Sequence, residues 1–316
     1  IYFSTGNPGP DYNGAIRAGD NLFTASIVAI DAHTGEYRWH FQQVHHDIWD
    51  YDAPNPVVLF DLEYEGVQRS GLAQAGKTGW IYILDRITGE PLVGIEERPV
   101  PQEPRQATAA TQPFPIGDPF VTQTLDIPPE GFQLANQGKI FTPFWDEPVL
   151  LKRGEANWPP STVDPDKGYI YVCAGERQAA YSTQIDTDLA ASGDRYTGGS
   201  MRFAPVPTTG VVAAVNLRNN KVVWSQRWSS RCYSGLVASA GGLVFAGRND
   251  GRFTAINSSN GNKLWEYMTD AGVNAPPAIF EHEGTQYVAV LSAGNLLAGS
   301  KRGDSVWLFG LESDEV

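Results

Sequence analysis

The stretch Ala29-Ile30-Asp31-Ala32-His33-Thr34-Gly35, which runs on to Trp39, recurs along this chain of 316 residues. A similar segment leads from Ala214-Val215-Asn216 to Trp224, and another leads from Ala255-Ile256-Asn257 to Trp265. Residues 83–89 are a fourth copy that lacks the tryptophan. The step from Ala214 to Ala255 is 41 residues, a spacing typical of a four-stranded propeller blade.

Each copy has a simple physical meaning. An apolar strand, such as 26–30, leads into a polar turn with a glycine where positive φ is tolerated. A second strand then carries a tryptophan, which buries about 150–250 Å2 when it is packed. The repeat therefore predicts that Trp39, Trp224 and Trp265 are largely buried between neighbouring sheets.

Strands are also expected over 79–84, 169–173, 242–245 and 287–291, and no stretch has a sustained apolar period of 3.6 residues. The 33 glycines and 22 prolines require frequent turns. The sequence predicts an all-β fold, a β-propeller of four-stranded blades, as a single domain over 1–316. We expect long excursion loops at about 99–148, which is rich in Pro and Gln, and at about 178–207.

The repeats supply about four to five blades, whereas a propeller must close to remove its sheet edges. Residues 1–3 read as part of a strand. We therefore expect an incomplete propeller, whose upstream part lies outside this sequence or on a separate chain.

The composition excludes some classes of protein. Apolar residues make up 41% and charged residues 19%, as in folded soluble proteins. The net charge of -13 disfavours nucleic acid and anionic membranes as partners, and no apolar run predicts a transmembrane helix. Cys173 and Cys232 allow either a disulfide or two buried thiols, and so few cysteines suit the periplasm and the cytosol equally.

The densest cluster of chemically active side chains is His45-His46-Asp47-Ile48-Trp49-Asp50-Tyr51-Asp52-Ala53-Pro54. On an extended segment Asp50 and Asp52 point the same way, and two close carboxylates repel unless a cation lies between them. Oxygen ligands suit calcium, magnesium or a trivalent ion of similar size, whereas no Cys/His spacing supports zinc. The alternative is a solvated acidic turn.

Four motifs resemble the quinoprotein alcohol and glucose dehydrogenases, which depend on pyrroloquinoline quinone (PQQ). His46-Asp47-Ile48-Trp49-Asp50 is similar to a signature of that family. So are Ser4-Thr5-Gly6-Asn7-Pro8 with the later Gly19-Asp20-Asn21, Lys77-Thr78-Gly79, and the stretch 238–245. The motifs follow the family order and the resemblance runs from residue 1 to about residue 310. It implies the C-terminal portion of an eight-bladed periplasmic enzyme.

The resemblance also implies roles for individual residues. Asn7, Asp50 and Asp52 would bind one metal ion, which is calcium, magnesium or a lanthanide. Asp50 would be the general base. The cofactor PQQ would contact the residues Lys77, Asn157, Tyr233, Gly294 and Asn295. Because these groups must share one pocket, we expect Asn7, Asp50 and Lys77 to converge near the propeller axis.

The activity implied by the resemblance is oxidation of an alcohol or sugar hydroxyl. Asp50 would take the proton, the metal would act as a Lewis acid, and a hydride would pass to the quinone. Electrons would then go to a cytochrome c or a membrane quinone. The chain has no Cys-x-x-Cys-His motif for a c-type haem. The family's metal-binding Glu, aromatic floor and vicinal disulfide have no counterpart here.

Two questions stay open at this level. A non-catalytic propeller scaffold of the outer-membrane assembly type would share the repeat, but it would not need Asn7, Asp50, Asp52 and Lys77 together. The substrate could be a primary alcohol, a sugar or a polyol. The second carboxylate, Asp52, occurs in both glucose dehydrogenases and lanthanide-dependent methanol dehydrogenases, and extra negative charge favours a trivalent ion.

Overall fold

Short antiparallel strands make up most of the molecule. The structure is a computed structural model that describes residues 1–125, 129–130, 132 and 134–310. The first sheet contains β1 (Tyr2–Ser4), β2 (Ser26–Ile30) and β3 (Tyr37–Gln42), and the second contains β4 (Val58–Tyr64), β5 (Val67–Ala75) and β6 (Ile81–Asp85). The third sheet contains β9 (Val149–Glu155), β10 (Thr162–Asp164), β11 (Tyr169–Thr183), β12 (Gly199–Phe203), β13 (Thr209–Asn216) and β14 (Lys221–Trp228).

Two further sheets and a hairpin complete the described strands. The fourth sheet contains β15 (Leu236–Ala238), β16 (Leu243–Gly247), β17 (Arg252–Asn257) and β18 (Lys263–Met268). The fifth sheet contains β19 (Ala278–His282), β20 (Thr285–Ser292) and β21 (Ser305–Gly310). A two-stranded hairpin pairs β7 (Ile95–Pro99) with β8 (Thr111–Pro115).

The repeated turn has the same hydrogen bonds in the three copies that contain the glycine, whereas the fourth copy has Asn220 at that position, with a φ of +55°. At Asp31, Asp85 and Asn257 the side-chain Oδ1 accepts the backbone N–H groups two and three residues further on. The glycine four residues after each has a φ of +74°, +80° and +76°, where an L side chain is strained. In all three copies that carry a tryptophan, the strand register shifts next to it. The sequence repeat is therefore also a repeat of backbone geometry.

Each packed tryptophan lies on the turn glycine of the next sheet. A Cβ added to Gly89 would come within 2.7 Å of the Trp39 ring, and one added to Gly261 within 2.6 Å of the Trp224 ring. The indole Nε1 of each donates to a backbone carbonyl of that same turn, at 3.2 and 2.9 Å. Trp39 is 7% exposed and Trp224 is 9% exposed, so the predicted burial is confirmed for both.

The prediction for Trp265 is wrong, because this side chain is 40% exposed. Trp265 lies on β18 and contacts the rings of Phe253, Tyr267 and Phe309. In the described part of the chain the neighbouring sheet has only β19, β20 and β21. Among the described residues, no turn glycine of this sheet contacts the Trp265 ring.

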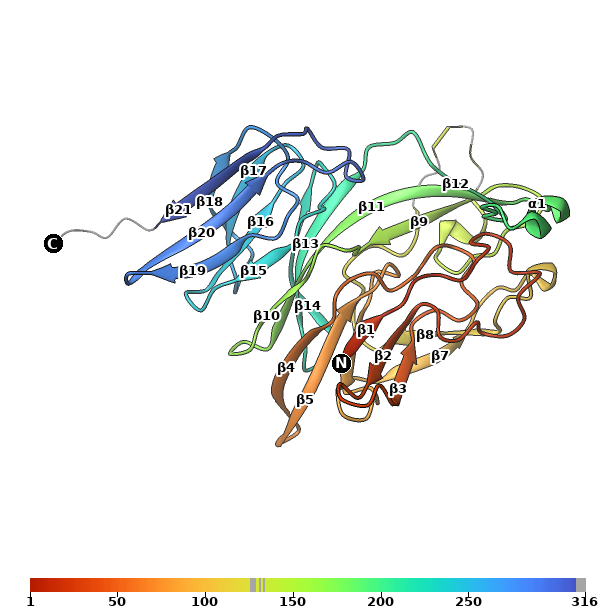
Figure 1. Cartoon of the computed structure of the whole chain (residues 1–316), viewed down its shortest axis with the longest axis horizontal. Coiled ribbons are helices and arrows are strands. Elements are labelled where there is room, and N and C mark those ends of the chain that lie inside the picture. The colour runs from red at the N-terminus through yellow and green to blue at the C-terminus, as the bar shows by residue number, and fades with distance from the viewer. Residues whose placement is uncertain (126–128, 131, 133, 311–316) are drawn as a thin grey trace.

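The hydrophobic cores lie between consecutive sheets. One joins Phe60 and Ile83 to Ile170 and Val215, and the next joins Tyr171 and Trp224 to Val244. The sheets follow one another in chain order, from the red β1–β3 to the blue β19–β21 (Figure 1). Sheets stacked through apolar faces in this order are blades of an all-β propeller, as predicted, and the described sheets do not close into a ring.

The excursions carry structure of their own. Residues 99–148 hold β8 and the short 3-10 helices η1 (Pro104–Gln106) and η2 (Asn136–Gly138). Residues 178–207, expected as a loop, hold the outer half of β11, the helix α1 (Thr187–Ser192) and β12. No helix in the described ranges has the length and apolar character needed to cross a membrane.

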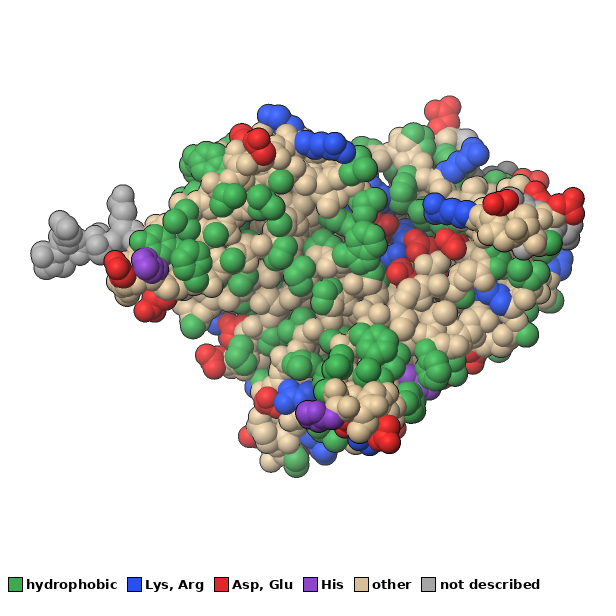
Figure 2. Space-filling model, in the orientation of Figure 1, with side chains coloured by type: hydrophobic (Ala, Val, Ile, Leu, Met, Phe, Trp, Pro, Cys, Tyr) green, Lys and Arg blue, Asp and Glu red, His purple; other side chains and the backbone are tan. Residues whose placement is uncertain are grey.

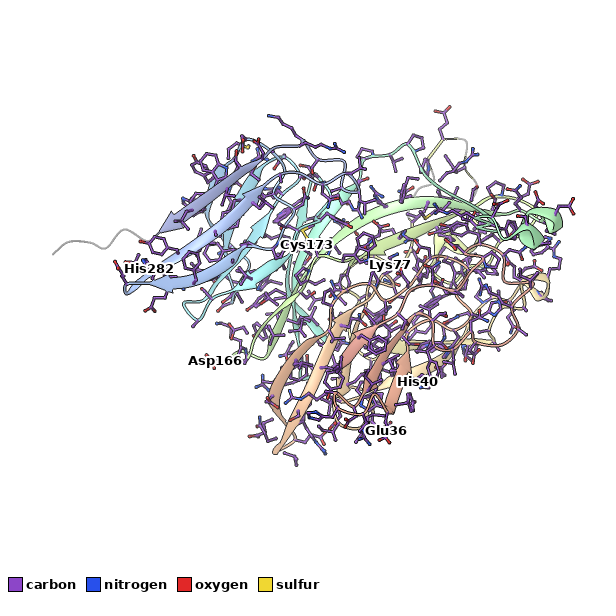
Figure 3. The ribbon with its side chains drawn as sticks, viewed as in Figure 1. Glu36, His40, Lys77, Asp166, Cys173 and His282 are labelled. Atoms are coloured by element: carbon purple, nitrogen blue, oxygen red, sulfur yellow. A yellow bond between two sulfur atoms is a disulfide. The ribbon has the colours of Figure 1, made fainter. Side chains whose placement is uncertain are left out.

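The two cysteines form a disulfide, which settles the alternatives left open by the sequence. Cys173 lies on β11 and Cys232 lies in the loop between β14 and β15. Figure 3 labels Cys173 in the middle of the molecule. The bond therefore ties the third sheet to the loop that leads into the fourth sheet.

Candidate cofactor site

A cavity of about 500 Å3 lies where several connecting loops meet. Six of the predicted site residues line it, namely Asn7, Asp50, Asp52, Lys77, Asn157 and Tyr233. The expected convergence of Asn7, Asp50 and Lys77 in one pocket is therefore observed. The volume is within the range of small-molecule and cofactor sites.

The lining residues come from loops of four different sheets. Asn7 follows β1, Asp50 and Asp52 lie between β3 and β4, and Lys77 lies between β5 and β6. Asn157 follows β9, and Tyr233 lies between β14 and β15. Figure 2 shows acidic and basic side chains gathered in a hollow of this face, where Figure 3 labels Lys77.

Two predicted residues do not line the cavity. Gly294 and Asn295 begin the connection between β20 and β21, and only Leu297 of that connection reaches the cavity. The Asn295 Oδ1 accepts the N–H groups of Leu297 and Ala298 at 2.8 and 3.1 Å. Within this structure, Gly294 and Asn295 therefore stabilise the conformation of the loop and do not face the pocket.

The loop that carries Asp50 is held by Asp47. The Asp47 carboxylate is fully buried and accepts the N–H groups of Trp49 and Tyr51, both at 2.8 Å. Burial raises the pKa of Asp47 to about 7. Asp50 itself has a φ of +59°, which is uncommon for a residue other than glycine. Asp47 is thus a structural member of the acidic cluster.

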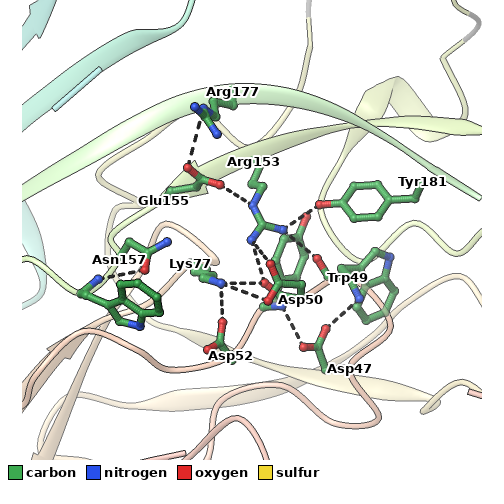
Figure 4. A network of polar contacts seen from close by, with 12 residues as sticks. Asp47, Trp49, Asp50, Asp52, Lys77, Arg153, Glu155, Asn157, Arg177 and Tyr181 are labelled. Carbon is green, nitrogen blue, oxygen red and sulfur yellow. Dashed lines mark hydrogen bonds and ion pairs between the residues drawn. The ribbon is translucent and has the colours of Figure 1, made fainter. Parts of the chain in front are cut away.

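Asp50 contacts two cationic side chains. The Arg153 Nη2 donates to its Oδ2 at 2.6 Å, and the Lys77 Nζ lies 3.1 Å from its Oδ1. Burial raises the pKa of this carboxyl, but the charges of Arg153 and Lys77 outweigh burial, so the pKa is lowered. Asp50 is therefore ionised at neutral pH (Figure 4).

Asp52 lies beside the same lysine. Its Oδ1 forms an ion pair with the Lys77 Nζ, yet burial raises its pKa, with the Asp50 charge acting in the same direction. The cation that separates the two carboxylates in this structure is thus the Lys77 ammonium. The turn 76–80, closed by a bond from the Gly76 N–H to the Trp80 carbonyl, places Lys77 there.

The chain offers an incomplete set of metal ligands. Asn7, Asp50 and Asp52 supply oxygen donors, which suit a hard cation, but calcium takes 6–8 oxygens. Across residues 1–310, apart from the few that are not described, no group of three or more His, Cys, Asp or Glu side chains is arranged to hold a metal. The ligand atoms are therefore of the type that a hard cation prefers, but this chain supplies too few of them to complete its coordination.

Sequence reasoning missed a buried network of arginines and one glutamate. Arg153 is 1% exposed, and its Nε donates to Glu155 at 2.6 Å. Its remaining N–H groups reach Trp49, Asp50 and Tyr181 (Figure 4). Arg177 and Arg231 also lie near Glu155. The available signal was the charged pair Arg153 and Glu155, two residues apart on a strand and thus facing one side.

His46, which belongs to the matching motif, does not line the cavity. Its ring is fully buried, and its two nitrogens lie 2.6 and 2.7 Å from the carbonyl oxygens of Gly19 and Gln106. The imidazole therefore joins two loops.

A family model described as "Glucose/ethanol/alcohol dehydrogenase, beta-propeller domain", with PQQ in its name, matches residues 1–197 and 206–288. The chain belongs to this PQQ-dependent dehydrogenase family. The chain is 31% identical to the quinoprotein alcohol dehydrogenase PedH of Pseudomonas putida, over 92% of this chain and 47% of the relative. It is 29% identical to the lanthanide-dependent methanol dehydrogenase of Methylorubrum extorquens, over 95% of this chain and 48% of that relative.

Solved structures agree with this assignment. The quinohemoprotein alcohol dehydrogenase of Comamonas testosteroni matches this chain with a TM-score of 0.72 and 25% identity, over 98% of this chain and 46% of that one. The chain thus spans about half the length of the relatives it matches, and those relatives are enzymes.

Proposed function

We propose that the chain forms part of the active site of a PQQ-dependent dehydrogenase that oxidises an alcohol or sugar hydroxyl. The observation that carries the proposal is the meeting of Asn7, Asp50, Asp52 and Lys77 in one cavity from three separate loops. A scaffold would not need an ionised carboxylate paired with two buried cations there, because buried charges are costly unless they have a function or good partners.

Asp50 would act as the general base. It is ionised, and it lines the cavity with its side chain 22% exposed. Arg153 occupies Oδ2, which leaves Oδ1, beside the longer Lys77 contact, to accept a substrate proton. Lys77 would then turn its ammonium group toward a quinone oxygen. When bound, PQQ supplies the hydride acceptor and the metal ion supplies Lewis acidity.

The metal ion would be held by Asn7, Asp50 and Asp52, with further ligands from elsewhere in the protein. Lys77 would have to leave its position between the two carboxylates, because like charges exclude each other from one site. Similarity to the lanthanide-dependent methanol dehydrogenase and to a europium-containing methanol dehydrogenase supports a lanthanide as one candidate. Calcium and magnesium are the other two.

The test of the base is Asp50→Asn, which keeps the size of the side chain and removes its charge. With PQQ and metal supplied, turnover of an alcohol with a dye acceptor should fall at least about 100-fold, the usual effect of losing a general base. Asp166→Asn, at an exposed aspartate outside the cavity, is the matched control. Retained turnover in Asp50→Asn would remove Asp50 from this role.

The five sheets would belong to a larger propeller. Gly35 of the first sheet has no heavy atom within 4 Å of an added Cβ, and Val306 and Leu308 of the last sheet are 73% and 60% exposed. An apolar sheet face of this kind favours coverage by further blades. Intact mass of the native protein tests this: a stable monomer of 34.5 kDa that binds PQQ unaided would contradict it.

The periplasm is the proposed location, and a cytochrome c or a membrane quinone is the proposed electron acceptor. The Cys173–Cys232 disulfide supports an oxidising compartment. Similarity to a protein named lupanine 17-hydroxylase [cytochrome c], at 31% identity over 96% of this chain, supports the cytochrome. Cell fractionation, followed by reduction of purified cytochrome c during turnover, would test both statements.

A further inference from the structure

Three guanidinium groups surround the single carboxylate of Glu155, which is 3% exposed. The Arg153 Nε lies 2.6 Å from Oε1, and the Arg231 Nη2 lies 2.7 Å from Oε2. The Arg177 Nε is 3.9 Å from Oε2. Figure 4 shows Arg177 on the side of Glu155 away from Asp50 and Lys77. One carboxylate cannot neutralise three cations, so this wall of the cavity carries excess positive charge.

Arg153 is not the source of that excess, because its donors already reach Asp50, Glu155, Tyr181 and a backbone carbonyl. Arg177 and Arg231 differ. Both line the cavity, and the Nε atom of each is buried without a hydrogen-bond partner among the described residues. Arg231 is itself only 5% exposed. The two Nη atoms of Arg231 donate to the Leu297 carbonyl and to Glu155, at 2.9 and 2.7 Å. A buried charged donor without an acceptor is unfavourable, so the Nε of each group has unused capacity for an anion.

Aromatic rings hold both guanidinium planes in place. Arg177 stacks over Phe203 at 3.9 Å, and Arg231 stacks over Tyr233 at 4.3 Å. A stacked guanidinium keeps its donors in a fixed fork, which matches a carboxylate in a bidentate contact. The described cavity lining has five cations and four carboxylates. The side chains alone therefore leave one positive charge in excess, and a bound metal ion would add to it, so the cavity favours an anionic ligand.

We propose that Arg177 and Arg231 form a carboxylate-binding subsite in this cavity. The inference rests on the proposed function, which offers two sources of the carboxylate. PQQ carries carboxylate groups, and so would a substrate that is a hydroxy acid. In either case the subsite would fix the ligand by its charged end, with its reacting group toward Asp50 and Lys77.

The test is ligand binding to the full protein, followed by tryptophan fluorescence. Trp158 lines the cavity and is 60% exposed, so it is suited to report a bound ligand. PQQ is compared with its methyl esters, and glycolate is compared with ethylene glycol. The variants are Arg177→Gln and Arg231→Gln. The matched control is Arg227→Gln, whose Nε lies 2.9 Å from the buried Glu176 and which does not line the cavity.

A cofactor subsite would raise the dissociation constant of PQQ at least about tenfold in both variants, with no change for the esters or in the control. A substrate subsite would leave PQQ binding intact and raise the dissociation constant of glycolate by a similar factor, with ethylene glycol unchanged. Wild-type-like binding of PQQ and glycolate in both variants would overturn the proposal. If the wild type binds no PQQ, the proposed function fails, and the glycolate titration alone decides the subsite.

Should Arg231→Gln fail to fold, Arg177→Gln still decides. The Arg177 side chain is 19% exposed, and among the described residues its one carboxylate contact is the 3.9 Å approach to Glu155. Circular dichroism of each variant identifies a folded sample before titration.

Discussion

The contribution to stability of the contact between a tryptophan and the turn glycine of the next sheet can be tested by adding one methyl group to that glycine. In Gly261→Ala the new Cβ would lie 2.6 Å from the Trp224 ring, and the residue would keep a φ of +76°. The left-handed backbone costs an alanine about 1–2 kcal/mol. Overpacking against the ring costs about 1–3 kcal/mol more. We expect a total loss of about 2–5 kcal/mol in the free energy of unfolding.

Gly66→Ala is the matched control for this change. Its φ is +80°, but an added Cβ would have no heavy atom within 4 Å. Only the backbone cost of about 1–2 kcal/mol should then appear. Urea denaturation, followed by tryptophan fluorescence, measures both variants. Equal losses in the two would refute the reasoning that the indole ring is packed on the Gly261 turn.

Three further predictions concern the disulfide, a buried acid and the metal. Replacing Cys173 and Cys232 by alanine opens a loop with a separation of 59 residues, and the chain-entropy model gives a loss of about 4 kcal/mol in urea denaturation; an unchanged midpoint would contradict this. Burial raises the pKa of Glu176, but Lys152, Thr209 and Arg227 outweigh it and lower the pKa. Glu176→Gln should therefore be less stable than wild type at neutral pH, and the gap should close as the pH falls below about 4.3, through the lowered pKa; a gap that stays constant in acid denaturation curves would argue against the pairing. Asp52→Asn should reduce affinity for a lanthanide more than affinity for calcium, because Coulomb attraction grows with the charge of the ion. Equal losses in calorimetry would contradict this dependence on charge, and unchanged affinities for both ions would exclude Asp52 as a metal ligand.

The sequence was sufficient for local features of the fold. The spacing from Asp31 to Gly35 and on to Trp39 is set by one turn and one strand, so it could be read without knowing the neighbours. The burial of a tryptophan depends on what lies beside it. Trp224 and Trp265 have the same local pattern, but among the described residues a covering turn glycine contacts only Trp224 of the two.

The site shows the same division between local and distant information. Asp50, Asp52 and Lys77 lie in short motifs that a resemblance can transfer residue by residue. Arg231 and Arg177 reach Glu155 from two other segments, and nothing in their flanking residues indicates a buried charge. Such contacts depend on how the sheets stack, which no local periodicity specifies.

The tryptophan-to-glycine contact gives the row of sheets a direction. Each ring points to the following sheet, so one end of the row offers an open glycine turn and the other end offers the apolar outer face of β19–β21. If two copies met through the same end, two glycine turns or two apolar faces would lie against each other. Such a contact would lack the pairing of a tryptophan ring with a glycine turn. The favoured contact is heterologous, head to tail. Such contacts either close into a ring or continue into a filament. Closure of the ring is therefore what separates a discrete particle from an open-ended polymer in this architecture.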